Sequence, residues 1–206
     1  MSDYEAMQSA RNSAAKALQA ANPNLVPVSA KVDSLQAAGK NVRIELKRAF
    51  PGVKFSVKTS RYSMGCSLSV NWVDGPNADQ VSAISGKYSG GSFNGSEDLY
   101  EYSRDAWTDA FGDAKYVSDR RDYSDKAVAS AIRTVQAKYA GNLSARNINE
   151  IKVEDLRAGR LWNVEVMGNW SDYLSLQAII NRELARRTWA LDRTPKPAEM
   201  AEEQPA

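Results

Sequence analysis

Two short segments in the middle of the chain alternate apolar and polar side chains, and this pattern limits the fold more than any other feature. In the first segment, residues 53–58, the apolar positions are Val53, Phe55 and Val57. In the second, residues 66–72, they are Cys66, Leu68, Val70 and Trp72. Successive side chains of a strand point to opposite faces, so each segment is a strand with one face on a core. With a turn at 60–65, the sequence predicts an antiparallel hairpin.

The polar positions of the hairpin also fall into two groups. We expect the first group to lie beside the second on the polar face of the hairpin. The first comprises Lys54, Ser56 and Lys58, and the second comprises Ser67, Ser69 and Asn71.

Amphipathic segments surround the predicted hairpin. Val42, Leu46, Ala49 and Phe50 recur at helical spacing, and Pro51 ends that helix. Further helices are predicted at about 77–86, from 125 to about 140 and at about 173–191, with a helical turn within 104–113. Strand candidates lie at 99–102, 115–117 and 161–167. We therefore predict an α+β fold, with a small antiparallel sheet, helices packed on one face and a C-terminal helical segment.

The organisation along the chain follows from the same patterns. Residues 1–38 are predicted to be a polar helical or mobile arm, and residues 39–141 an α+β domain. Residues 142–193 hold a strand and a helix packed on or beside that domain. Residues 194–206, rich in Pro, Ala and Glu, are predicted to be a disordered tail.

Missing residue types exclude several chemistries. The chain has no histidine, which excludes Ser-His-Asp catalysis and histidine-ligated metal sites. A single cysteine, Cys66, excludes an internal disulfide framework. No cofactor and no enzymatic activity are predicted. The sequence also has no apolar run of about 18 residues and no signal-peptide pattern at its start. We therefore expect a cytoplasmic location, with no membrane partner.

The small net charge hides two opposed segments. The whole chain carries 27 basic and 25 acidic side chains, for a net charge of +2. Residues 40–72 hold seven basic side chains and one acidic one, whereas residues 97–125 hold nine acidic and four basic. The sequence leaves open whether the two segments face each other or face solvent.

The basic segment supplies the candidate binding residues. Cations beside hydroxyl and amide donors suit phosphate oxygens, so this helix–hairpin face predicts contact with a nucleic-acid backbone or with an acidic protein patch. The alternative is a solvated face that answers the acidic segment. The candidate partner-binding residues are Arg43, Lys47, Lys54, Lys58 and Arg61.

The acidic segment supports a minor enzymatic alternative. Hard cations prefer oxygen ligands, so Asp98 or Glu101 together with Asp119 or Asp122 could hold a metal for phosphodiester chemistry. A charged surface explains the same residues. The glycine-rich segment 86–95 matches no phosphate-binding pattern and is predicted to be a connecting loop. The aromatic residues that flank it suit either base stacking or a core, and they are Tyr88, Phe93, Tyr100 and Tyr102.

The order of motifs over about residues 40–140 resembles a large polyvalent protein-associated domain. The resemblance is carried by the segments Phe50 to Phe55 and Trp72 to Pro76. The later matches are Gly86, Phe93, Gly95, Asp98, Tyr100, Arg121, Tyr123 and Ser124. Such domains occur in proteins of phages and conjugative elements that are linked to counter-defence and to the protection of incoming DNA. The resemblance carries over no catalytic residue.

This resemblance implies a non-enzymatic binding protein of a mobile element. Its predicted action is counter-defence in the host cell, by binding a host defence complex. Nucleic-acid binding through the basic helix–hairpin face and a carboxylate–metal phosphodiesterase are the alternatives. A structural or assembly role is a third class, and a homodimer is left open.

Overall fold

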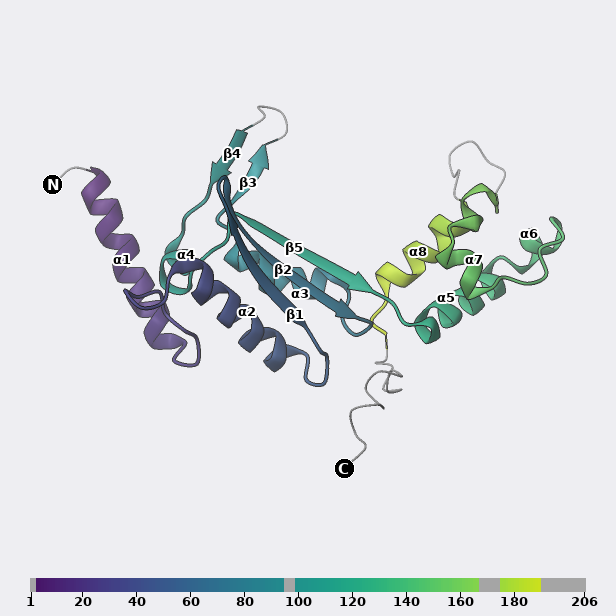
Figure 1. Cartoon of the computed structure of the whole chain (residues 1–206), viewed down its shortest axis with the longest axis horizontal. Coiled ribbons are helices and arrows are strands. Elements are labelled where there is room, and N and C mark those ends of the chain that lie inside the picture. Colours follow the sequence, from purple (N-terminus) through teal and green to yellow (C-terminus); the bar gives the residue numbers. More distant parts are fainter. Residues whose placement is uncertain (1–2, 95–98, 167–174, 190–206) are drawn as a thin grey trace, which may run out of the picture. The chain divides into compact units, whose positions relative to one another are not determined.

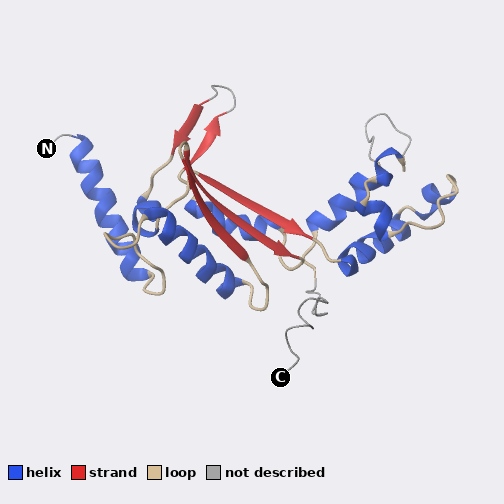
Figure 2. Cartoon of the chain, in the orientation of Figure 1, coloured by secondary structure: helices blue, strands red, loops and turns tan. Residues whose placement is uncertain are grey.

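The computed structural model describes residues 3–94, 99–166 and 175–189. The chain divides into two units, each described by itself (Figure 1). Unit 1 comprises residues 1–72 and 76–122, and unit 2 comprises residues 73–75 and 123–206. Helices and strands both occur in unit 1, as Figure 2 shows, and the predicted α+β class is confirmed.

The main sheet of unit 1 has three strands in the order β1-β2-β5. They are β1 (Ser56–Tyr62), β2 (Gly65–Val73) and β5 (Tyr116–Asp122). The predicted antiparallel hairpin is confirmed as β1 and β2, and its register pairs Ser56 with Asn71 and Lys58 with Ser69. In Figure 1 the arrow of β5 runs in the same direction as that of β2, so the sheet is mixed. The long connection through α3 and α4 allows this parallel pairing.

The glycine-rich segment predicted as a connecting loop is more regular than expected. It contains a 3-10 turn, η1 (Gly86–Tyr88), and the strand β3 (Gly91–Asn94), which pairs with β4 (Leu99–Tyr102) in a separate two-stranded sheet. The amide of Gly90 donates to the carbonyl of Ala114 at 2.9 Å, and the amide of Ser103 donates to the carbonyl of Gly90 at 2.9 Å. These backbone bonds fix a segment that carries few apolar side chains.

Helices cover one face of the three-stranded sheet. The helices of unit 1 are α1 (Asp3–Ala21), α2 (Ser34–Ala49), α3 (Ala78–Ser85) and α4 (Ala106–Phe111). α2 packs on β1, and α3 packs on β5. Together with the inward side chains of the hairpin they form one core, which includes Val42, Leu46, Leu68, Val70, Trp72, Val81 and Phe111.

The start and end of α2 follow from local chemistry. The Asp33 carboxylate accepts a hydrogen bond from the Gln36 amide at 3.0 Å, which satisfies one of the unpaired donors of the first turn. Phe50 follows the last helical residue, because the residue before Pro51 avoids helical angles.

The buried amide of Asn41 joins three segments of unit 1. Its Nδ2 donates to the Val26 carbonyl at 2.9 Å and to the Phe111 carbonyl at 3.1 Å. Its Oδ1 accepts from the Val26 amide at 2.7 Å. The loop after α1 and the end of α4 are therefore both tied to α2, and every polar atom of this buried side chain is used.

The segment predicted as a polar arm holds the helix α1, which packs on α4. Ala15 is its buried residue, and Gln19 Nε2 donates to the Ala110 carbonyl at 3.2 Å. Arg11 Nε lies 2.5 Å from Asp109 Oδ2. The thin apolar stripe of this helix is thus supported by polar contacts.

Unit 2 is helical in its described residues. Its elements are α5 (Asp125–Lys138), α6 (Ala140–Ser144), α7 (Val153–Arg157), the 3-10 turn η2 (Arg160–Asn163) and α8 (Leu176–Arg186). The core of unit 2 includes Val128, Ile132, Val135, Leu161, Leu176, Ile180 and Leu184. Among the described residues, no helix has the length and apolar character needed to cross a bilayer.

The predicted strand at 161–167 is wrong in its described part. Residues 160–163 form η2, and Glu165 makes only an isolated bridge with Ser175. The apolar residues that suggested a strand do not share one face. Leu161 and Val166 are buried in the core of unit 2, whereas Trp162 is 56% exposed. Residues 167–174 and 190–206 lie outside the described residues, and with them parts of the predicted helix at 173–191 and the predicted tail.

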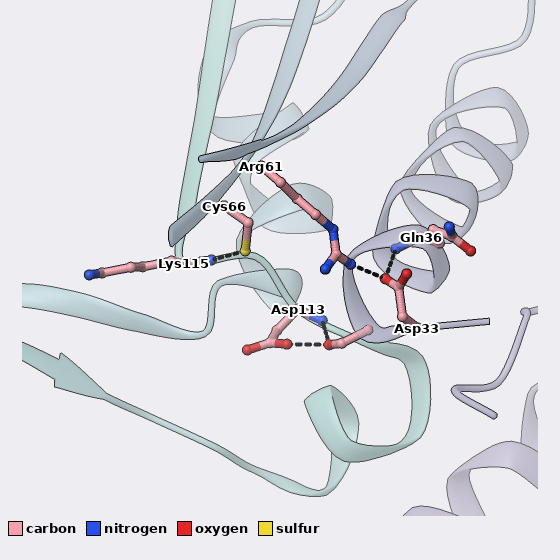
Figure 3. A network of polar contacts seen from close by, with 7 residues as sticks. Asp33, Gln36, Arg61, Cys66, Asp113 and Lys115 are labelled. Carbon is pink, nitrogen blue, oxygen red and sulfur yellow. Dashed lines mark hydrogen bonds and ion pairs between the residues drawn. The ribbon is translucent and has the colours of Figure 1, made fainter. Parts of the chain in front are cut away.

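Gly112 provides a test of how unit 1 is closed. It ends α4 with φ +88°, and a Cβ at this position would stand 2.0 Å from the Ser34 carbonyl oxygen. The next residue, Asp113, donates its amide to Ser34 Oγ at 2.8 Å (Figure 3). We expect Gly112→Ala to lower the free energy of unfolding by about 2–4 kcal/mol, measured by urea denaturation.

The matched control for this substitution is Gly86→Ala. Gly86 has helical angles (φ −61°, ψ −26°), and the nearest atom to its added Cβ is 3.9 Å away. It should leave the free energy of unfolding within about 0.5 kcal/mol of the original. Equal urea midpoints for the two variants would show that the contact between α4 and Ser34 does not constrain unit 1.

Candidate binding surface

The face of the three-stranded sheet opposite the helices is here called the open face. Every second side chain of each strand points to this face, and most of these side chains are polar. Those of the two outer strands are exposed, and those of the central strand are half-buried by their neighbours. The open face consists of Ser56, Lys58, Ser60 and Tyr62 of β1, Ser67, Ser69 and Asn71 of β2, and Tyr116, Ser118, Arg120 and Asp122 of β5.

The rows across the open face can be read from two contacts. The β1–β2 register sets Lys58 beside Ser69. On the other side, Ser118 Oγ donates to Ser69 Oγ at 3.0 Å. Because β2 and β5 run in the same direction, Tyr116 then lies near Ser67, and Arg120 lies near Asn71. The middle of the face is therefore small and polar, with serine hydroxyl groups in neighbouring rows.

Aromatic and cationic side chains stand around this polar centre. Tyr62 and Tyr116 are 46% and 42% exposed, respectively, and Lys58 is exposed. Arg120 Nε lies 3.8 Å from Asp122 Oδ1, with both side chains well exposed. Such a contact is worth little and leaves the guanidinium accessible to a ligand.

Lys115 adds a fixed positive charge next to Tyr116. Its ammonium nitrogen donates to the Met64 carbonyl at 3.2 Å, and it lies 5.4 Å from the ring centroid of Tyr116 and 5.9 Å from that of Tyr102. Its backbone amide donates to Cys66 Sγ at 3.4 Å (Figure 3). Desolvation lowers the pKa of Lys115, but the two phenol groups raise it and prevail. The ammonium group therefore stays protonated at neutral pH.

The five predicted binding residues do not lie together. Arg43 and Arg61 face the helix side. Arg43 Nη1 donates to the Gly39 carbonyl at 3.0 Å and Nη2 to the Val57 carbonyl, while Arg61 Nη2 lies 2.5 Å from Asp33 Oδ1 (Figure 3).

The three lysines of the prediction are spread as well. Lys47 is exposed on α2, Lys54 precedes β1, and Lys58 is on the open face. Lys58 and Arg61 are an odd number of positions apart on one strand, so they point to opposite sides of the sheet. The five residues therefore do not form one continuous basic surface, and their role in binding a partner stays a prediction.

The structure adds three residues that the prediction missed, Tyr62, Tyr116 and Arg120. β5 alternates exposed and half-buried residues without a fully buried one, so it lacks the apolar period that reveals a strand in sequence. The signal that could have found it is the alternation of Tyr116, Ser118 and Arg120 after the predicted start of a strand at 115.

Two carboxylates of the acidic segment pair with arginines outside the basic segment. Asp109 lies 2.5 Å from Arg11, and Asp125 lies 3.0 Å from Arg157. Arg61 of the basic segment pairs with Asp33 instead. Asp109, Asp125 and Arg61 are therefore not paired between the acidic and basic segments.

Asp119 and Asp122, the two alternative partners of Asp98 or Glu101 at the proposed metal site, lie on different sides of β5. Asp119 faces the helices, where Ser85 Oγ donates to its Oδ2 at 2.7 Å, and Asp122 is exposed on the other side. Asp98 and the side chain of Glu101 lie outside the described residues. In the part of the chain that the structure describes, no three Cys, Asp or Glu side chains gather where they could hold a metal ion.

The aromatic residues near the glycine-rich segment divide between the two predicted roles. Tyr88 is fully buried and anchors the core: its hydroxyl group donates to Glu45 Oε2 at 2.6 Å, and burial raises its pKa. Lys87 contacts the same carboxylate at 2.5 Å. Tyr102 is exposed and belongs to the surface around Lys115. The side chains of Phe93 and Tyr100 lie outside the described residues.

Residues 33–124 match the sequence model of large polyvalent protein associated domain 29, which confirms the resemblance seen in the sequence. The match begins at Asp33, the N-cap of α2, and ends at Ser124, the N-cap of α5. It contains the whole three-stranded sheet and therefore the whole open face. No curated protein and no solved structure matches the chain.

Asp119 gives a pH test of the helix side of β5. Burial raises the pKa of its carboxyl above the ordinary value, and the Ser85 hydrogen bond only partly opposes this. A raised carboxyl pKa lowers stability as pH rises from the unfolded-state value through the folded-state value. We therefore expect Asp119→Asn to raise the urea midpoint relative to the original chain at pH 7, with a smaller gain near pH 3.

The control on the same strand is Asp122→Asn, whose carboxylate is exposed. Its effect on the urea midpoint should be small and should change little between the two pH values. If Asp119→Asn instead lowers the midpoint at pH 7, the carboxylate has a stabilising partner that its burial and its hydrogen bond with Ser85 do not reveal.

Proposed function

We propose that this chain, whose residues 33–124 form a large polyvalent protein associated domain, is a non-enzymatic binding protein that counters a host defence system. This domain family is associated with large polyvalent proteins of mobile elements. The chain acts by binding a host defence complex that contains nucleic acid, and unit 1 contacts this complex through the open face.

One observation carries the proposal: a sheet in which one face is covered by helices and the other presents its side chains to solvent. The helix side supplies the core of unit 1, so the open face is not needed to bury apolar surface. A face that combines Lys58, Arg120 and two exposed tyrosines with serine hydroxyl groups suits a ligand that is negatively charged and rich in hydrogen-bond acceptors.

The residue types support binding over catalysis. The chain lacks histidine, the most frequent general base, and it has one thiol. Cys66 is half-buried, and its sulfur accepts a hydrogen bond from the Lys115 amide. Of the carboxylates of the phosphodiesterase alternative, the side chains of Asp119 and Asp122 are described, and among the described residues no three Cys, Asp or Glu side chains lie where they could hold a metal ion.

Charge reversal on the open face tests the proposal. We expect the tagged chain to retain a defence complex from a host lysate and to raise the recovery of incoming phage or plasmid DNA in a defence-proficient host. The double variant Lys58→Glu with Arg120→Glu should weaken retention about tenfold or more, which corresponds to at least 1.4 kcal/mol. Retention is measured by quantitative mass spectrometry, and recovery by counting plaques or transconjugants.

The matched control is Lys40→Glu with Arg48→Glu. Both side chains are exposed on α2, on the other side of the sheet, and the pair carries the same total change of charge as the double variant. It should leave retention and recovery unchanged. The proposal fails if the double variant behaves as the original chain does, or if recovery rises equally in a host that lacks the defence system. Mg²⁺-dependent cleavage of nucleic acid, abolished by Asp122→Asn, would favour the phosphodiesterase instead.

A further inference from the structure

We infer that the open face binds single-stranded nucleic acid, with bases stacked on Tyr62 and Tyr116 and phosphates contacted by Lys58 and Arg120. This inference rests on the proposed function, since it names the part of the defence complex that the open face contacts. It is carried by the distribution of side-chain types over the three strands.

The centre of the open face does not suit a protein partner. Fully buried centres of protein interfaces are apolar and rich in aromatic residues. Here the central positions are hydroxyl and amide side chains, with Ser67, Ser69 and Asn71 on β2 and Ser118 beside them. If a protein covered this centre, the hydroxyl and amide donors would each need an acceptor from that protein. A polynucleotide offers acceptors along its whole length, on its phosphates and its base edges.

The two tyrosines suit bases that are free to stack. Tyr62 and Tyr116 lie on the outer strands, so their strands are about 10 Å apart across the sheet. Both rings are substantially exposed, whereas the neighbouring positions on this face hold serine. Aromatic rings on an exposed sheet provide stacking surfaces for successive bases of a single strand. The bases of a duplex are stacked on each other and cannot present their faces to these rings.

The two cations lie in the two rows that follow the row of Tyr116, where the phosphates of a strand stacked on the tyrosines would lie. Lys58 lies in the row of Ser69 and Ser118, next to the row of Tyr116. Arg120 lies one row further along β5. The ammonium group of Lys115 is held 5.4 Å from the Tyr116 ring centroid, so a base stacked on that ring would have a positive charge nearby. A strand laid across the face thus meets rings and charges in neighbouring rows.

Fluorescence anisotropy with labelled oligonucleotides tests the inference. The probes are a mixed-sequence single-stranded DNA 20-mer, the RNA of the same sequence and the DNA duplex, each between about 50 and 200 mM salt. The full chain should bind a single strand more tightly than the duplex, with affinity that falls as salt rises. Tyr62→Ala and Tyr116→Ala should each weaken single-strand binding about tenfold, because each removes a stacking surface.

Three variants separate stacking from other effects. Tyr62→Phe and Tyr116→Phe keep the ring and should keep most of the affinity. Tyr4→Ala removes an exposed tyrosine from α1, away from the open face, and should change nothing. Circular dichroism of each alanine variant checks that it is folded. Loss of affinity in the phenylalanine variants equal to that in the alanine variants would overturn the stacking role.

The remaining outcomes distinguish this inference from the proposed function. The inference is overturned if no single strand binds at the lowest salt, if the duplex binds equally well, or if the alanine variants bind like the original chain. If a defence complex is nonetheless retained after nuclease treatment, and Lys58→Glu with Arg120→Glu releases it, the proposed function stands without the inference. If oligonucleotides bind as expected but recovery of incoming DNA is unchanged, the inference stands and the counter-defence function fails.

Discussion

The contact between Gly39 of α2 and Thr59 of β1 sets how unit 1 is built. A Cβ at position 39 would stand 2.7 Å from the Thr59 methyl carbon, so the helix backbone lies directly on the strand. Arg43, one turn later, donates to the Gly39 carbonyl and to the Val57 carbonyl. Because α2 lies so close to β1, it covers the apolar face of the hairpin and completes the core there. The opposite side of the sheet is the open face, where the side chains of the outer strands are exposed to solvent.

This arrangement divides the basic segment by role. The guanidinium groups of Arg43 and Arg61 are used within the fold, one on backbone carbonyls and one on the Asp33 carboxylate at the start of α2. Planar, multiply donating guanidinium groups suit such bracing better than a lysine ammonium does. Lys58 is on the side where no helix packs, and it is joined there by Arg120 from outside the segment. A count of charges along the sequence cannot make this distinction.

The sequence predicted the hairpin because the period-two pattern is local and one face is apolar over Leu68, Val70 and Trp72, but residues 60–62, predicted as part of the turn, belong to β1. It predicted α5 from an equally local pattern, the helical spacing of Val128, Ile132 and Val135. In the structure Ser124 Oγ accepts a hydrogen bond from the Ala127 amide as the N-cap of this helix. β5 was underestimated because its strand character comes from pairing with β2, more than 40 residues earlier, and not from its own side chains. The open face depends on that pairing, so most of the candidate site could not be read from local pattern.

The limits of the family match bear on what the open face is for. The match runs from one helix cap, Asp33, to another, Ser124, and every residue of the open face lies between them. α1 lies outside the match and packs on α4 through Ala15 and the Arg11–Asp109 ion pair, on the helix layer and not on the open face. Additions to the domain can therefore attach to the helix side while the open face stays accessible. The surface proposed to bind can be kept when such a domain is joined to other modules in a large polyvalent protein, because its residues all lie on the sheet.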